Sequence, residues 1–375
     1  MKNIGVYIHI PFCIKKCLYC DFISYSYNKL DVENYIEYLL KEIEYRKNQF
    51  KDYMVDTIYF GGGTPSLLSV QEMNKIINHL FLFYKVSENV EITVECNPNT
   101  LNLEKLVGYK KCLVNRISMG VQSFDNLKLK ELGRQHNVED VRNSLKWVNK
   151  SGFDNISIDM MFGLPNQNIN DVNKELDYIS SIENLNHISY YSLTIMENTP
   201  FGKMNIEKIV PEDYENRKMY YKIIERLSKI DIYQYEISNF SKIGYESKHN
   251  LKYWELGPYI GFGVAAHSFY DNKRTYNKSK LIDYFNQLNK SYTEIIDEVL
   301  TPKDSMAEYM MLGFRLNKGI DINNFKRKYN MDIFSVYNKE IEDLINQKLI
   351  VKKENSLIST AKGIDYMNII GETFL

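Results

Sequence analysis

Along the first two thirds of the chain, short apolar runs alternate with longer segments in which apolar residues recur every three or four positions. The short runs are rich in β-branched and aromatic residues, which favour strands. They lie at residues 5–10, 57–60, 90–95, 115–119, 156–160 and 188–195. The segments between them have the spacing of amphipathic helices. The pattern predicts a β-strand followed by an α-helix, repeated six times.

The helix after the first strand shows this spacing clearly. Its apolar stripe consists of Val32, Tyr35, Ile36, Leu39, Leu40 and Ile43. The next helix opens at Ser69, with Glu72 three residues later, which is the pattern of a capping box. Further helices are expected at 103–113, 138–149, 171–182 and 212–227. Near-continuous apolar strands joined by helices favour a parallel sheet, so the expected fold class is α/β, closed as a barrel or partial barrel.

From about Thr301 the pattern changes to that of a small α+β domain. Helices are expected at 305–316, 322–329 and 333–347, followed by a hairpin of 349–351 with 356–358 and a last helix. Helices that lead into a hairpin are winged-helix-like, which raises nucleic-acid binding as a function. Residues 301–375 carry 11 Lys and Arg against 10 Asp and Glu, whereas a DNA reader needs a basic face. We therefore expect a packing or partner-contact domain and no nucleic-acid partner.

Composition excludes further classes. The 47 basic and 48 acidic residues give a net charge of -1, which favours neither nucleic acid nor an anionic membrane surface. The longest apolar runs, such as 80–84, are too short to span a bilayer, and only five residues precede the strand-like run at Val6. We expect a soluble, cytoplasmic protein with reduced thiols, in which clustered cysteines bind metal or take part in catalysis.

Polar and glycine-rich residues follow five consecutive strands, at the ends where parallel barrels place their chemistry. In chain order they are Cys13, Cys17 and Cys20, then Gly61–Ser66, Glu95–Pro98, Gly120–Ser123, and Asp159 with Gly163–Pro165. Any one of these segments alone could be a turn. Their shared position at one rim of the sheet favours a common site.

Three of the five cysteines lie within eight residues, in the spacing Cys-x3-Cys-x2-Cys. An odd number makes a disulfide framework improbable, and Cys96 and Cys112 lie in unrelated sequence contexts. A cubane of four irons takes four ligands, so three thiolates leave one iron open to chelate a small molecule. Zinc is the alternative, with a distant His or Asp as fourth ligand, but zinc sites usually space neighbouring cysteines as Cys-x2-Cys.

With these motifs the chain resembles the radical S-adenosylmethionine (SAM) superfamily, and within it the branch that contains oxygen-independent coproporphyrinogen III dehydrogenases and haem chaperones. The resemblance covers nearly the whole length. It rests on YIHIPFC at 7–13, YFGGGTPS at 59–66, GVQSF at 120–124, GRQH at 133–136 and IDMMFGLP at 158–165. It implies a radical SAM partial (β/α)6 barrel with a C-terminal domain of the kind found in that branch.

The resemblance also implies roles for individual residues. Cys13, Cys17 and Cys20 would hold a [4Fe-4S] cluster whose open iron binds SAM. The residues at SAM-binding positions are Tyr7, Tyr19, Gly62, Gly63, Thr64, Glu95, Gln122, Arg134 and Asp159, the last three matching contacts to a second SAM. Glycines suit such a contact because a side chain would hold the backbone away from the ligand. An ion pair across the barrel mouth is an alternative role for Arg134 and Asp159.

Several features favour the chaperone over the dehydrogenase. Asp21 and Phe22 stand where the dehydrogenase carries a further cysteine, and only 12 residues precede Cys13. The segment 247–254 fits a His-Asn-x-x-Tyr-Trp signature of the chaperones. It implies haem binding by His249, Tyr253 and Trp254, with His249 as axial ligand and His267 as a competitor. The alternative is a surface loop in which Trp254 plugs the core and His249 makes an ordinary hydrogen bond.

The resulting interpretation divides the chain into a radical SAM barrel at 1–240, a connecting segment with the haem motif at 241–300 and a C-terminal domain at 301–375. The expected function is that of a haem chaperone, which passes haem to acceptor proteins. The family resemblance implies that these acceptors include membrane-bound respiratory enzymes, which the protein would reach at the membrane periphery. The alternatives are coproporphyrinogen III dehydrogenation, in porphyrin metabolism, or another radical SAM modification. If SAM is cleaved, a flavodoxin or ferredoxin would donate the electron. No catalytic residue is assigned.

Overall fold

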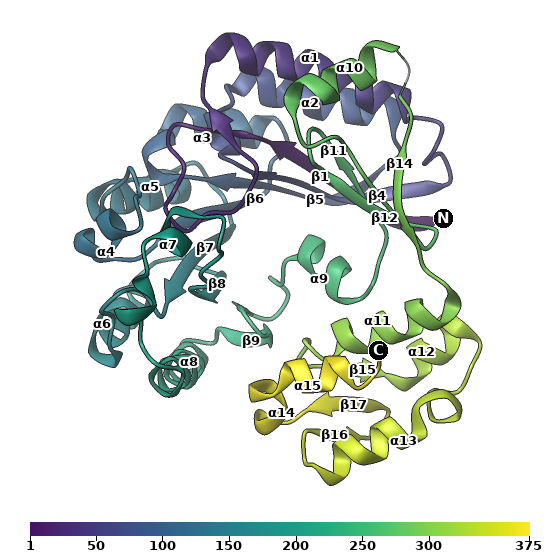
Figure 1. The fold of residues 1–375 in the computed structure, drawn as a ribbon. Helices are drawn as coiled ribbons and strands as arrows, with labels where there is room; N and C mark the ends of the chain where they lie inside the picture. The colour runs from purple at the N-terminus through teal and green to yellow at the C-terminus, as the bar shows by residue number, and fades with distance from the viewer. Residues whose placement is uncertain (291) are drawn as a thin grey trace.

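A curved sheet of 12 strands forms the main body of the computed structural model, which describes residues 1–290 and 292–375 (Figure 1). Its six central strands are parallel and follow the chain order: β1 Lys2–Ile10, β4 Tyr53–Gly62, β5 Val86–Cys96, β6 Arg116–Gln122, β7 Asn155–Phe162 and β8 His187–Ser192. The expected α/β partial barrel is confirmed.

Helices cover the outer face of this sheet (Figure 1). They are α1 Lys29–Tyr45, α2 Val70–Phe83, α3 Leu103–Lys111, α5 Val138–Lys150, α6 Ile169–Ser180 and α8 Asp213–Ser228. The predicted apolar stripe of α1 is buried throughout. Ser69 and Glu72 form the expected capping box at the start of α2. Burial of these apolar faces against the sheet stabilises the barrel, because it removes them from water.

Alternate residues of a strand point to opposite faces of a sheet, and β6 shows the consequence. Ile117, Met119 and Val121 belong to the hydrophobic core, while Arg116 and Ser118 line an inner cavity. The barrel therefore has an apolar outer layer and a polar interior. Shorter elements surround its mouth: β2 Phe12–Cys13, β3 Tyr25–Ser26, α4 Asn126–Glu131 and α7 Pro200–Lys203.

Residues 241–300 are more than the connecting segment that the sequence predicts. They contain α9 Lys248–Trp254, β11 Tyr259–Phe262, β12 His267–Tyr270, β13 Lys273–Tyr276, α10 Leu281–Lys290 and β14 Ile295–Val299. β11 pairs parallel with β1, and β12, β13 and β14 continue the sheet antiparallel. At the other edge lie β10 Asn239–Ser241 and β9 Tyr233–Glu236. The helix α9 lies on the concave side of the sheet (Figure 1).

The C-terminal part has a core of its own and the expected winged-helix-like order. Its elements are α11 Pro302–Gly313, β15 Ile320–Asp321, α12 Ile322–Tyr329, α13 Ile333–Asn346, β16 Ile350–Lys353, β17 Ser356–Ser359, α14 Ala361–Asp365 and α15 Met367–Glu372. β16 and β17 form the predicted hairpin. In the described part of the chain, no helix is long and apolar enough to cross a membrane.

Candidate functional site

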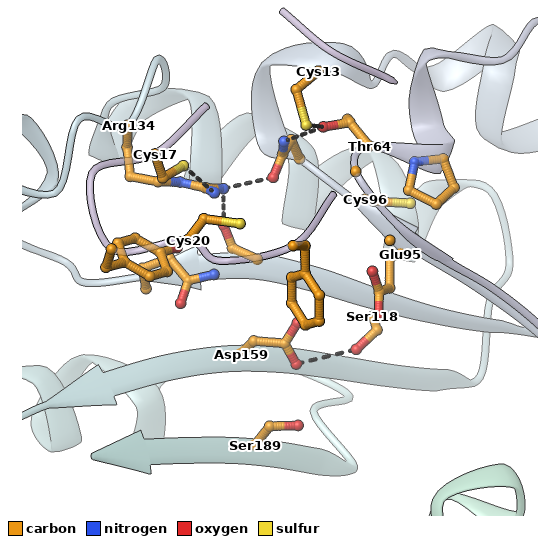
Figure 2. A pocket seen from close by; sticks show the side chains of 18 of the residues that line it. Cys13, Cys17, Cys20, Thr64, Glu95, Cys96, Ser118, Arg134, Asp159 and Ser189 are labelled. Atoms are coloured by element: carbon orange, nitrogen blue, oxygen red, sulfur yellow. Dashed lines mark hydrogen bonds between the residues drawn. The ribbon is translucent and has the colours of Figure 1, made fainter. Parts of the chain in front are cut away.

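One cavity of about 440 Å³ opens at the carboxyl ends of the parallel strands. Among the residues that line it are Cys13, Cys17, Tyr19, Cys20, Gly62, Gly63, Thr64, Glu95, Gln122, Arg134 and Asp159. Figure 2 shows side chains from several strand ends converging on this space. The structure thus gathers residues that are more than a hundred positions apart in the sequence around a single volume.

The three cysteines lie on a loop that the barrel holds in place. Phe12 and Cys13 pair with Tyr25 and Ser26, and the backbone N–H of Leu18 donates to the carbonyl of Leu132 at 3.1 Å. These contacts turn the loop so that all three thiols line the cavity. Among the described residues, no group of three or more His, Cys, Asp or Glu side chains is arranged to hold a metal ion.

The surroundings of the thiols suit anionic sulfur. Thr64 donates its hydroxyl to Sγ of Cys13 at 3.5 Å, and Arg134 donates to Sγ of Cys17 at 3.4 Å. Burial raises the pKa of the Cys13 and Cys20 thiols. A cation or an iron centre is therefore needed to hold them as thiolates, the form that binds metal. The donor set, three cysteines with hydrogen-bond support on a shared cavity, fits a cluster with three cysteine ligands.

Arg134 spans the wall of the cavity. Its guanidinium donates to Oδ1 of Asn97 at 2.5 Å and to the carbonyl of Gly120 at 2.7 Å, as well as to Cys17. Asp159 instead accepts a hydrogen bond from Ser118 at 3.1 Å. The alternative of an ion pair between Arg134 and Asp159 is not formed among the described residues. Arg134 keeps part of its hydrogen-bonding capacity for a ligand, since its Nε is buried and without a partner there.

Burial raises the pKa of two carboxyl groups in the cavity. Burial, followed by the charge of Asp159, raises the pKa of Glu95 to about 7, although the Tyr59 hydroxyl donates to Glu95 at 2.8 Å. Burial also raises the pKa of Asp159. Since a protonated carboxyl donates a hydrogen bond and a carboxylate only accepts, Glu95 can serve either role toward an ammonium or a ribose hydroxyl.

The glycine-rich loop meets the cavity with its backbone, and packing against the preceding segment is a further reason for glycine here. Gly62 has a φ of +108°, and a Cβ there would lie 2.5 Å from the ring of His9. A Cβ on Gly63 would lie 2.7 Å from the Phe12 carbonyl oxygen. A side chain at either position would thus collide with the end of β1. The glycines allow the loop to pack against the segment that carries the cysteines.

Of Tyr7, Tyr19 and Cys96, two line the cavity and one does not. Tyr7 is absent from the cavity lining: its hydroxyl lies 3.1 Å from Nδ1 of His9 and its ring stacks on Tyr59. Tyr19 does line the cavity, and burial raises the pKa of its hydroxyl. Cys96, which appeared unrelated in sequence, lies on the same wall, with its thiol directed to the Val94 carbonyl at 3.5 Å.

Several cavity residues lie outside the segments that the sequence singles out, namely Arg116, Ser118, Ser189 and Tyr191. A signal for some of them was available. Arg116, Ser118, Gly120 and Gln122 occupy every second position of β6, so they share its inner face. Polar residues at alternate positions of an otherwise apolar strand predict a polar barrel interior.

The segment expected to bind haem forms α9 rather than a surface loop. His249 is 1% exposed, with Oγ1 of Thr57 2.8 Å from its Nδ1 and the Tyr253 hydroxyl 2.9 Å from its Nε2. Its ring stacks on Tyr59 with centroids 5.1 Å apart. Burial, then the charges of Lys252 and Arg116, lowers the pKa of His249 to about 3. The imidazole is neutral, as an axial ligand must be, but both of its nitrogens are engaged.

The other residues considered for haem lie apart from the cavity lining. The ring of Trp254 faces the Arg315 guanidinium at 4.5 Å, and its Nε1 is buried without a partner in the described part of the chain. Trp254 thereby contacts the C-terminal domain. His267 begins β12, is exposed, and stacks on Tyr276. Of the two histidines considered as haem ligands, His267 is therefore exposed and His249 is enclosed.

Comparison with known proteins agrees with this architecture. A family model described as Radical SAM superfamily matches residues 7–179, and one described as HemN C-terminal domain matches residues 300–366. The structure of coproporphyrinogen III oxidase (HemN) from Escherichia coli, described as a radical SAM enzyme, superimposes with a TM-score of 0.87 at 20% identity. That match covers 100% of this chain and 90% of the other, so the two share a fold. The class of protein is a radical SAM protein with a HemN-like fold.

Curated relatives narrow the class to a family. The chain is 35% identical to "Heme chaperone HemW" of Lactococcus lactis subsp. lactis, covering 100% of this chain and 98% of the relative. It is 34% identical to the protein of the same name from Bacillus subtilis, with 96% of each covered. It is 36% identical to the Escherichia coli protein of that name, and that match covers 71% of this chain and 70% of the relative. The chain belongs to the HemW family.

Proposed function

We propose that this protein binds haem and passes it to acceptor proteins, and that its cavity holds a SAM-ligated [4Fe-4S] cluster. The observation that carries the proposal is full-length similarity to relatives named as haem chaperones, at 35% identity over 100% of the chain. The acceptors we propose are haem proteins, including membrane-bound respiratory enzymes, reached from the cytoplasm. A flavodoxin or ferredoxin would serve as electron donor if SAM is cleaved.

Cys13, Cys17 and Cys20 would hold the cluster. When bound, a cluster with one iron free of cysteine supplies a point of chelation for SAM and an electron for its cleavage. The chain's own groups would hold the rest of that ligand. Gly62, Gly63 and Thr64 would present backbone and hydroxyl groups, while Glu95, Gln122, Arg134 and Asp159 would supply polar side chains.

The haem part of the proposal requires α9 to move. His249 can ligate iron only after it leaves Thr57 or Tyr253, because each ring nitrogen is engaged with a hydroxyl. Each such hydrogen bond contributes about 1 kcal/mol net. Displacing α9 also breaks the contacts of Glu91 with the N–H groups of Lys248 and His249 and the ion pair of Lys252 with Asp56, so the iron–imidazole bond has to offset all of these. We propose that His249 becomes the axial ligand once α9 is displaced, with Tyr253 and Trp254 beside the porphyrin. His267, which is exposed, is the competing ligand.

Anaerobically reconstituted protein, incubated separately with haem and with coproporphyrinogen III, tests this function. We expect a Soret band from bound haem, transfer of that haem to an apo-haem protein, and no decarboxylated product. His249→Ala should shift the Soret band and weaken binding, whereas His79→Ala, on the outer helix α2, should not. If His249→Ala, His267→Ala and the double variant all keep the wild-type spectrum and affinity, neither histidine is the ligand. Conversion of coproporphyrinogen III without haem binding would replace the chaperone by the dehydrogenase.

A further inference from the structure

Arg116 is a buried arginine whose side chain forms no hydrogen bond or ion pair with the described residues. It stands at the start of β6, lines the cavity, and is 1% exposed. Its Nε atom is buried and has no hydrogen-bond partner among the described residues. Arg46, a buried arginine of the outer layer, differs: it donates to Glu42 at 3.1 Å, to the carbonyl of Gly261 at 2.9 Å and to Gln49 at 3.1 Å. Its Nη2, which also lacks a hydrogen-bond partner among the described residues, lies 3.6 Å from the Glu294 carboxylate. Burial alone therefore does not explain the state of Arg116.

The neighbours of Arg116 in the sheet repeat this feature. Thr93 on β5 and Asn155 on β7 are its partners in strand register. Oγ1 of Thr93 and Oδ1 of Asn155 are also buried and without a hydrogen-bond partner in the described part of the chain. Three adjacent strands thus contribute a row of unsatisfied polar groups to one level of the barrel interior. Such groups are costly unless water or a ligand pairs with them.

The charges around Arg116 do not neutralise it through contact. Among the described residues, Glu95 accepts a hydrogen bond from Tyr59 and Asp159 accepts one from Ser118, and neither carboxyl group pairs with Arg116. The guanidinium stays charged under all ordinary conditions. An unpaired buried cation is strongly unfavourable, and a ligand anion would relieve it.

The position of Arg116 also links the cavity to α9. His249 of α9 stacks on Tyr59, which lines the same cavity as Arg116. The next residue along α9, Asn250, lines the same cavity as Arg116. An anion bound by Arg116 would therefore lie between β6 and α9, close to the imidazole that we propose as haem ligand.

We propose that Arg116 forms a carboxylate subsite on the inner face of β6, and that it takes a propionate group of the haem that His249 ligates once α9 is displaced. This inference rests on the proposed haem function. A carboxylate fits because the guanidinium fork donates two parallel hydrogen bonds to its two oxygens. The carboxylate of an SAM molecule offers the same chemistry, so both sources enter the test.

The test compares ligands with and without the carboxylate on wild type, Arg116→Met and Arg116→Lys. The ligand pairs are haem against haem dimethyl ester, and SAM against 5'-methylthioadenosine, each titrated anaerobically. Wild type should bind haem about tenfold more tightly than its ester, one charge-assisted pair being worth about 1.4 kcal/mol or more. Arg116→Met should bind haem and ester alike, and Arg116→Lys should discriminate partially, because it keeps the charge without the fork. Unchanged melting temperatures would verify that the variants fold, and the lysine variant carries the test if the methionine variant does not.

The outcomes separate this subsite from the function beneath it. If Arg116→Met keeps the full preference for haem over its ester, the propionate assignment is wrong while the chaperone function stands. If it loses instead the preference for SAM over methylthioadenosine, the subsite exists but serves SAM. If both preferences persist, no carboxylate subsite exists at Arg116. If wild type binds no haem, the chaperone function fails, and the SAM pair still decides whether Arg116 binds a carboxylate.

Discussion

The cavity wall and His249 of α9 differ in how their polar groups are engaged. On the wall, Nε of Arg116 and Nε of Arg134 are buried without a hydrogen-bond partner in the described part of the chain, and the thiols line open space. In α9, both nitrogens of His249 are engaged. The cavity is thus formed in advance for its ligands, whereas α9 is closed and has to open. SAM, which needs only the cavity, should bind without rearrangement, whereas haem, as a ligand of His249, should displace a helix.

The largest expected effect comes from the cysteine loop. Replacing Cys13, Cys17 or Cys20 by Ala should reduce iron and sulfide from about four each per chain to nearly none after anaerobic reconstitution, because each thiolate is an obligatory ligand. Cys112→Ala is the control, since that thiol is buried elsewhere and directed to the Val70 carbonyl. Cys96→Ala is a stricter control, because Cys96 lines the same cavity as the three cysteines. Its replacement should still leave the cluster intact. Zinc without sulfide in the wild type would contradict the cluster.

The two regions also differ in how well the sequence predicts them. The spacing of the cysteines and the polar strand ends locate the cavity, because parallel strands bring their carboxyl ends to one rim whatever the details of packing. The state of α9 depends on a distant partner: Glu91 accepts the backbone N–H groups of Lys248 and His249 at 3.4 and 3.3 Å. The polar neighbours of His249 in sequence suggest exposure, and only this tertiary contact buries it.

The same limit applies to the sheet edge and to Gly62. β11 to β14 have four or five residues each, too short for a clear alternation, and β11 gains its place by pairing with β1. The sequence indicates a functional glycine at position 62. It does not indicate that a side chain there would collide with the His9 ring. Local patterns determine elements and rims, whereas long-range contacts determine which side chains stay available.

A smaller effect is expected from opening α9 by mutation. His249→Ala should lower the free energy of unfolding by about 1–3 kcal/mol at neutral pH, because the hydroxyls of Thr57 and Tyr253 lose their partner. Urea unfolding measures it. The pH dependence of the stability that His249 contributes follows from its pKa in the folded protein, which is about 3 and lies below the ordinary value of 6.5. The unfolded chain takes up a proton below about pH 6.5 that folded His249 does not, so this contribution is present above that pH and is lost as pH falls toward 3.

Between about pH 6.5 and 5, the free energy of unfolding should fall less steeply with decreasing pH in His249→Ala than in the wild type. The two slopes should differ by up to about 1.4 kcal/mol per pH unit. His79→Ala, whose imidazole is only partly buried, serves as the control and should change this slope much less. Equal slopes for wild type and His249→Ala would show that His249 is not held neutral by its surroundings.

The claim that haem reaches His249 only when α9 leaves its place is tested most directly by amide hydrogen exchange. The rates for residues 248–254 are compared in the anaerobic protein with and without haem, with β6 as internal reference. The account predicts faster exchange in α9 on haem binding and unchanged exchange in β6, because the helix gives up its contacts with Glu91 and Thr57 while the sheet stays intact. Equal or slower exchange of α9 in the haem-bound protein would contradict it.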